Sequence, residues 1–153
     1  MVVAIIGILA AIATPDLLSM LRNSRTKSDI RDIYSAIQYA RMAAVKENQD
    51  ADIVFDVTAK TYTVSVGVNT RKSGTLHPTS DLYTNLTGNS FSFNSRGMSD
   101  DLSDATALST ESTENQFPCV FIHQIGAAYY LRCRISYGGS VSTQISTDGT
   151  TWH

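Results

Sequence analysis

The sequence predicts an α+β fold in which a long N-terminal helix packs on an antiparallel β-sheet head. Three observations lead to this prediction. The chain of 153 residues opens with an uninterrupted apolar run from Met1 to Ala13. Apolar residues then recur at spacings of three and four up to about Asn48, which is typical of an amphipathic helix. From Ala51 onward the spacing changes to two, the period of a strand with one buried face.

The opening run contains no charged, polar or aromatic side chain before Thr14. As a helix it spans roughly 20 Å, which is short of the ~30 Å hydrocarbon core of a membrane. A signal peptide has an apolar region of similar length, but no basic residue precedes this run and Thr14-Pro15-Asp16 is a poor cleavage site. A buried core helix would need a surrounding core that the polar remainder can hardly supply. We therefore divide the chain into an apolar helix segment, residues 1–21, and a globular head, residues 22–153.

The helix is expected to continue from Asp16 to about Asn48, and its part from residue 22 onward belongs to the head. Its apolar stripe is the face on which the rest of the head would pack. The stripe consists of Ile30, Ile33, Ile37, Ala40 and Ala44. Pro15 removes one backbone hydrogen bond inside the helix, so we expect a kink or a local loosening near Ala11. Gly7 adds a second weak point.

The charges are unevenly distributed, although the formal net charge is only −2. From Arg22 to Glu47 there are six basic and three acidic residues, whereas from Asn48 onward there are six basic and ten acidic residues. The sequence therefore predicts a basic helix that carries an acidic head, with no global attraction to nucleic acid.

Beyond the helix the pattern predicts antiparallel strands. Residues 51–57 and 61–68 alternate around a turn at residues 58–60, which predicts a hairpin with one buried face. Further strands are expected around Phe91 and Phe93 and at residues 117–123, 129–136 and 141–145. We interpret residues 70–87 as a polar loop. Residues 99–116 are rich in Ser, Thr, Asp and Glu and are expected to form an exposed, mobile loop.

The segment MVVAIIGILAAIATP resembles the N-terminal helix of type IV pilins and type II secretion pseudopilins. That family has a glycine at the place of Gly7 and a proline at the place of Pro15. Its members also carry a basic leader, a processing-site glycine, an N-methylated phenylalanine and a glutamate, none of which is present here. By this alignment the sequence begins inside the mature helix, and we expect the upstream codons to supply those residues. Restoring them would give ~20 apolar positions, enough to cross a membrane.

The segment DIYSAIQYARMAAVKENQDADIVFD narrows the resemblance to the GspH/FimT-like minor pilins. These typically show an Ala-Arg pair, then an alanine, a basic residue and an asparagine ahead of a strand. The matching residues here are Ala40, Arg41, Ala44, Lys46 and Asn48. Beyond about residue 57 the match is loose, so the resemblance covers the helix and the first strand.

The resemblance implies the pilin fold and a structural role as a minor pilin or pseudopilin in a type IV pilus or a type II secretion pseudopilus, with the filament tip as one location. The N-terminal helix would contact other pilin or pseudopilin subunits, and Gly7 and Pro15 would permit the bending that packing requires. Before assembly the helix would lie in the bacterial inner membrane with the head in the periplasm. Two alternatives stay open: a DNA-uptake receptor pilin, and the major pilin of a surface filament.

No catalytic, cofactor-binding or metal-binding pattern is found. The histidines are scattered, and no two of them stand at metal-ligand spacing with a cysteine or carboxylate. Asp100, Asp101 and Asp104 lack the glycine and the terminal glutamate of a calcium loop. A nucleophile motif, a phosphate loop and a dinucleotide fingerprint are all absent from the sequence. We therefore expect no enzymatic activity and no cofactor.

One pair of basic residues raises the question of DNA binding. Arg132 and Arg134 lie two apart on a predicted strand, so they share a face with Tyr130, and such a face could contact phosphate and stack a base. Some FimT-like pilins bind DNA through a basic motif in this region, but Leu131 stands here where that motif has glycine. We favour the alternative, a solvated strand face paired against the acidic residues of the head.

The two cysteines are expected to form one disulfide, because an exported chain meets an oxidising compartment. If the loop between the last long strands is centred on Gly126, Cys119 lies opposite Cys133 and both sulfur atoms point to the core. The alternative is two buried free thiols, because a register shift of one residue would place one cysteine on the other face of the sheet.

Overall fold

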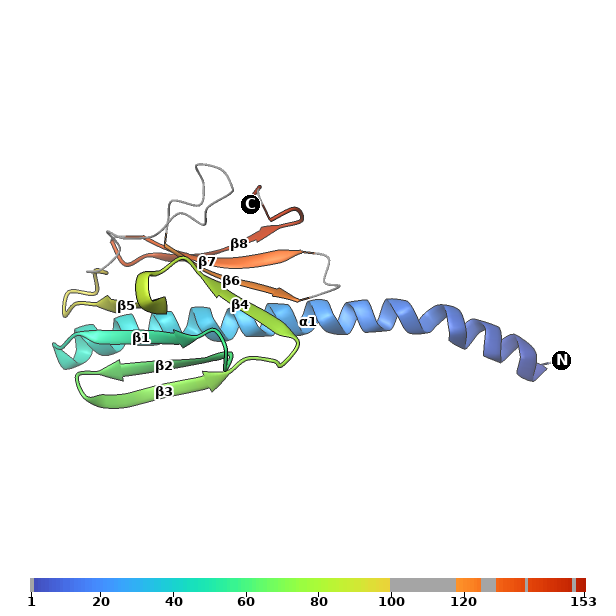
Figure 1. The fold of residues 1–153 in the computed structure, drawn as a ribbon, viewed down its shortest axis with the longest axis horizontal. Coiled ribbons are helices and arrows are strands. Elements are labelled where there is room, and N and C mark those ends of the chain that lie inside the picture. The colour runs from blue at the N-terminus through green and yellow to red at the C-terminus, as the bar shows by residue number, and fades with distance from the viewer. Residues whose placement is uncertain (1, 100–117, 125–128, 137, 150) are drawn as a thin grey trace.

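A single helix of 46 residues, α1 (Val2–Glu47), forms the long axis of the molecule (Figure 1). The computed structural model describes residues 2–99, 118–124, 129–136, 138–149 and 151–153, and side chains from Leu18 onward within these ranges except at Gln124. The C-terminal half of α1 lies against the head, whereas its N-terminal part extends beyond the head and bends away from the axis of the rest (Figure 1). The helix continues unbroken through Gly7 and Pro15, whose roles in flexibility stay a prediction.

The helix ends where the sequence predicts. Asn48 adopts a left-handed conformation (φ 51°), and the amide of Gln49 donates to the carbonyl of Ala44 over 3.2 Å. This is the Schellman arrangement, which satisfies a carbonyl group that the last turn of a helix leaves without a partner.

The described strands form two antiparallel four-stranded sheets beside α1. The first sheet has the order β3-β2-β1-β5 and contains β1 (Ala51–Asp56), β2 (Thr61–Val66), β3 (Asn69–Thr75) and β5 (Ser90–Phe93). The second sheet has the order β4-β6-β7-β8 and contains β4 (Ser80–Thr84), β6 (Cys119–Gln124), β7 (Tyr130–Ile135) and β8 (Val141–Ser146). A short 3-10 helix, η1 (Thr87–Asn89), precedes β5.

The predicted first hairpin is confirmed, since β1 and β2 pair from Ala51↔Val66 to Asp56↔Thr61. The predicted polar loop at residues 70–87 is wrong, because it contains most of β3 and all of β4. Strand β3 is an exposed edge strand, so neither of its faces needs apolar residues and its sequence shows no strand period. Of the predicted loop at residues 99–116, only Ser99 lies within the described residues, and its side chain is buried.

The core lies between α1 and the two sheets. Its helical side is the predicted stripe, because every one of those five residues is buried, with Ile33 and Ile37 fully so. Phe55 and Phe93 from the first sheet and Ile122 from the second belong to the same cluster. Burial of each such side chain stabilises the fold by about 1.5–3 kcal/mol, and the core therefore fixes the position of the helix against both sheets.

Candidate functional site

The part of α1 that leads away from the head exposes apolar side chains. Leu18, Met20 and Leu21 are 53%, 70% and 45% exposed. Large apolar side chains exposed together on one helix segment indicate a contact with another protein or with a membrane. Within the described part of the chain, no helix includes a stretch that is both long enough and apolar enough to cross a membrane.

Arg41 joins the helix to both sheets. Its Nε atom donates to the carbonyl of Gly97 over 3.0 Å, in the turn that follows β5, and its Nη2 atom donates to the carbonyl of Gly138 over 3.5 Å, between β7 and β8. These two turns lie so close that a Cβ atom on Gly139 would collide with the carbonyl oxygen of Gly97. The sequence singles out Arg41 only as part of the Ala-Arg pair, and the structure gives it the role of a link between the sheets.

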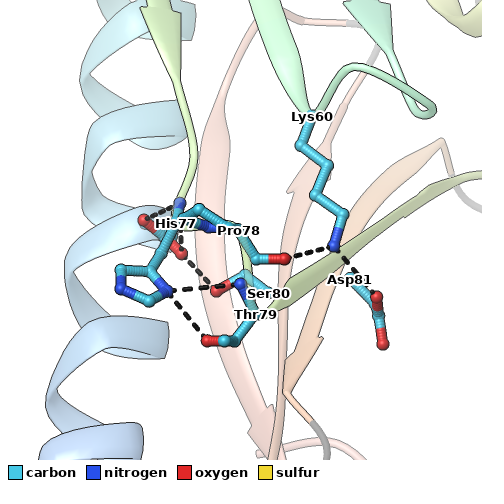
Figure 2. Close-up of polar contacts among 7 residues, drawn as sticks. Lys60, His77, Pro78, Thr79, Ser80 and Asp81 are labelled. Atoms are coloured by element: carbon cyan, nitrogen blue, oxygen red, sulfur yellow. Dashed lines mark hydrogen bonds and ion pairs between the residues drawn. The ribbon is translucent and has the colours of Figure 1, made fainter.

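Asp29 provides a second link, between the helix and the segment that joins the two sheets. This carboxylate is only 6% exposed and accepts hydrogen bonds from the backbone amide of His77, at 3.3 and 3.4 Å, and from the hydroxyl of Ser80. On the other side of the same segment, the Nζ atom of Lys60 donates to the carbonyl of Pro78 over 2.6 Å (Figure 2). The connection from β3 to β4 is therefore held from both sides.

Replacing Asp29 with Ala is expected to destabilise the head by about 2–4 kcal/mol, because the amide of His77 and the hydroxyl of Ser80 lose their acceptor in a largely buried place. Urea unfolding followed by circular dichroism measures the change. Asp32→Ala is the matched control, since Asp32 lies about one turn further along the same helix and its side chain is exposed. Equal midpoints for the two variants would contradict a structural role for the Asp29 carboxylate.

The predicted basic face on β7 is present, but Arg132 at its centre is not solvated. Arg132 is only 2% exposed, because its guanidinium lies 4.2 Å from the centre of the Trp152 ring and its Nε atom donates to Gln144 over 2.9 Å. Tyr130 is 36% exposed and stacks on the ring of His123 at 4.1 Å. Arg134 is half-buried.

Trp152 reaches Arg132 because the C-terminal residues fold back on the second sheet. The amides and carbonyls of Ile145 and His153 bond each other reciprocally, at 3.1 and 3.0 Å. This return brings the Trp152 ring to 5.7 Å from the ring of Phe121, on the face that carries Arg132. No period or motif in the sequence specifies such a return, and the expectation of a solvated face was therefore wrong for Arg132.

The predicted disulfide is not formed, because both cysteines are buried free thiols. The prediction placed Cys119 opposite Cys133, whereas the register pairs Cys119 with Arg134 and Val120 with Cys133. This shift of one residue puts the two cysteines on opposite faces of the sheet. The Cys133 thiol faces the helix and contacts the carbonyl of Ile30 at 3.8 Å.

Burial makes both thiols weak acids. It raises the pKa of Cys119 to about 11, although Arg132 and Arg134 act in the opposite direction. Burial also raises the pKa of Cys133, and the neighbouring Cys119 adds to the increase. Because the unfolded thiol of Cys119 ionises near 9.0, its contribution to stability is complete below that pH and is lost between pH 9.0 and about 11.

Alkylation of the native protein at pH 8 is therefore expected to be slow. The thiolate fraction of Cys119 is lower than that of an ordinary cysteine by roughly a hundredfold, and burial restricts access further. Mass spectrometry after treatment with iodoacetamide should find both cysteines modified once the protein is denatured without reductant. An unmodified denatured monomer would instead show that the two cysteines are bonded to each other.

The structure does not bring the histidines together. His77 lies in the link between the sheets, His123 lies on β6, and His153 bonds the edge of β8. Among the described residues, no group of three or more His, Cys, Asp or Glu side chains is placed to hold a metal ion. Asp100, Asp101 and Asp104 lie outside the described residues.

Comparison with known proteins gives matches only at the level of structure. No protein-family model and no curated protein sequence matches the chain. Two crystal structures of the type IV minor pilin FimU of Pseudomonas aeruginosa match with TM-scores of 0.58 and 0.60 at 15% identity, covering 76% and 78% of this chain and 90% and 87% of FimU.

The minor pseudopilin EpsH of the type 2 secretion system of Vibrio cholerae matches with a TM-score of 0.57 at 14% identity, covering 82% of this chain and 98% of EpsH. The likeness thus includes the two-sheet head, where the sequence resemblance is loose. At this level of identity the comparison establishes the architecture: the chain has the pilin fold, a long N-terminal helix packed on antiparallel β-sheets.

Proposed function

We propose that this chain is a minor pilin or pseudopilin, a structural subunit of a type IV pilus or a type II secretion pseudopilus. The observation that carries the proposal is the division of α1 into a half packed in the head and a part that extends beyond it with Leu18, Met20 and Leu21 exposed. Helices of neighbouring subunits would cover these side chains. The likeness to FimU and EpsH supports the same function.

In this proposal the extended helix has two successive environments. It lies in the inner membrane with the head in the periplasm, and it then enters the filament, where other pilin or pseudopilin subunits cover it. Gly7 and Pro15 would let the helix adjust its curvature between these environments. A place at the filament tip is the finer form of the proposal. The role is structural, and we expect no catalytic activity.

Filament incorporation tests the proposal. An epitope-tagged full chain, produced in a bacterium that assembles a type IV pilus or an overproduced pseudopilus, should appear in the sheared filament fraction. Leu18→Glu with Leu21→Glu should remove it from that fraction, whereas Ser19→Glu with Ser24→Glu should not, since all four side chains are exposed and the added charge is equal. Absence of the unmodified chain from filaments of both kinds would contradict the proposal.

The same preparation separates the minor from the major pilin. A minor subunit should be far less abundant in the sheared fraction than the principal subunit. A chain that forms most of the fibre mass would instead support the major-pilin alternative.

DNA binding by the protein is expected to be weak or absent. Arg132 is covered by Trp152, and the region from Asn48 onward has an excess of acidic residues, so the predicted strand face offers little positive surface to phosphate. Fluorescence anisotropy with a labelled duplex at physiological salt measures the affinity. Submicromolar binding that Arg134→Ala weakens would overturn this expectation and favour the DNA-uptake alternative.

A further inference from the structure

A hollow of about 250 Å³ lies between helix α1 and the edge strand β8. We refer to it as the β8 groove. Three residues come from the helix, one from β7, three from β8 and one from the C-terminal return. The lining residues are Lys27, Ile30, Arg31, Leu131, Thr143, Gln144, Ile145 and His153.

The edge of β8 beside this groove has backbone groups that point away from the sheet. In an antiparallel pair, alternate residues direct their amide and carbonyl to the neighbouring strand. Ile145 directs both groups outward, since they bond His153. Val141 and Thr143 share this phase, because they stand four and two residues before Ile145 on the same strand. Their backbone groups therefore point outward along the same edge.

The side chains of β8 do not protect this edge. Exposed edge strands commonly carry a charged side chain, a proline or a bulge that prevents another strand from adding. The sequence of β8 is VSTQIS, with no charge and no proline, and its pairing with β7 is regular from Tyr130↔Ser146 to Ile135↔Val141. The reciprocal bonding of His153 to Ile145 shows that an extended segment fits beside this strand.

The groove combines an apolar floor with a basic rim. Ile30 and Leu131 are 4% and 6% exposed, and Ile145 is 37% exposed. Lys27 and Arg31 lie one helical turn apart on the rim, and both are exposed. The Nζ atom of Lys27 lies 5.2 Å from the centre of the Tyr129 ring, and among the described residues neither cation forms an ion pair with a carboxylate. The charge of the rim therefore selects for an acidic partner.

We propose that the β8 groove binds an extended, acidic segment of a neighbouring filament subunit. The segment adds to β8 by main-chain hydrogen bonds to Val141 and Thr143, and its carboxylates lie against Lys27 and Arg31. His153 already occupies the edge at Ile145, so the added strand is short and the contact is weak on its own. Only the origin of the segment in a filament subunit rests on the proposed function.

A peptide titration with the full chain in detergent tests the groove without any filament. The probe is a short fluorescent peptide of alternating valine and glutamate. Two control peptides carry lysine in place of glutamate, or N-methyl groups on alternate amides, which remove the donors a strand needs. Anisotropy should show saturable binding of the first peptide and at least about tenfold weaker binding of both controls.

Variants of the chain locate the binding. The variant with Lys27→Glu and Arg31→Glu should bind the glutamate peptide about tenfold more weakly. It should bind the lysine peptide instead, a gain that an unfolded variant could not give. Thr143→Pro removes one outward amide and leaves the hydrogen bonds between β8 and β7 intact. It should therefore weaken binding of the glutamate peptide to the unchanged groove and of the lysine peptide to the charge-reversed groove. Arg22→Glu with Arg25→Glu is the control on the same helix, outside the groove.

Failure of the glutamate peptide to bind at millimolar concentration, or binding that is indifferent to the groove variants and to N-methylation, would overturn the proposal. Either result would leave filament incorporation untouched. Conversely, peptide binding by a chain that never enters filaments would contradict the proposed function and keep the groove as a site for an acidic segment of another source.

Discussion

Removal of residues 1–21 is expected to change the protein from one that partitions into detergent to a soluble monomer. The truncated chain loses Leu18, Met20 and Leu21 together with the apolar run before them. The head should stay folded, because the first buried residues of the helix are Thr26, Asp29 and Ile30 among the side chains the structure describes. Detergent phase partitioning and sedimentation measure the two forms.

The expected difference is nearly complete, since each exposed apolar side chain on the extended helix adds about 1.5–3 kcal/mol of preference for an apolar phase. Circular dichroism of the truncated chain should retain the unfolding transition of the full chain. If both forms were equally soluble, the extended helix would not be an anchor and the assembly proposal would lose its main support.

Gly139→Ala is expected to destabilise the head by about 3 kcal/mol or more. Gly139 has a φ of +74°, where an L side chain is strained, and its new Cβ would collide with the carbonyl oxygen of Gly97. That oxygen is the acceptor of the Arg41 Nε atom, so the substitution also disturbs the link between the sheets. Urea unfolding measures the loss.

Gly149→Ala is the control that separates the strain of a positive φ from the collision with the Gly97 carbonyl oxygen. Gly149 has a similar φ of +77°, but the three atoms nearest to its Cβ belong to the ring of Tyr130, the closest at 3.6 Å, which is an ordinary contact. This control should cost about 1–2 kcal/mol, the strain alone. If Gly139→Ala cost no more than Gly149→Ala, the close approach of the two turns would contribute nothing to stability.

The sequence predicts those parts of the fold whose periods are local. The stripe from Ile30 to Ala44 repeats with the helical period, and the hairpin of β1 and β2 alternates around a compact turn, so neighbouring residues alone determine both. Strand β3 is missed because an edge strand exposed on both faces has no period, and the division of the strands into two sheets depends on distant pairing.

The predictions of the disulfide and of the solvated basic face were wrong for a related reason. Whether Cys119 meets Cys133 depends on a register that differs from the prediction by one residue, and one residue reverses the face. The exposure of Arg132 depends on where Trp152 lies, twenty residues later in the chain. The links through Asp29 and Arg41 join residues that are separated by 48 and 97 positions in the chain, and no local sequence pattern predicts such contacts.

Those two links also bear on how the head would respond to mechanical load. In the proposed filament, tension along its length would reach each head through α1, because neighbouring subunits would cover the extended part of that helix. Asp29 and Arg41 hold the sheets at points about 18 Å apart along that helix. Strands lie alongside the helix, so tension would load both attachments together in shear (Figure 1). The head would then resist stretching as one body, and the strands of the two sheets would not separate from the helix one after another.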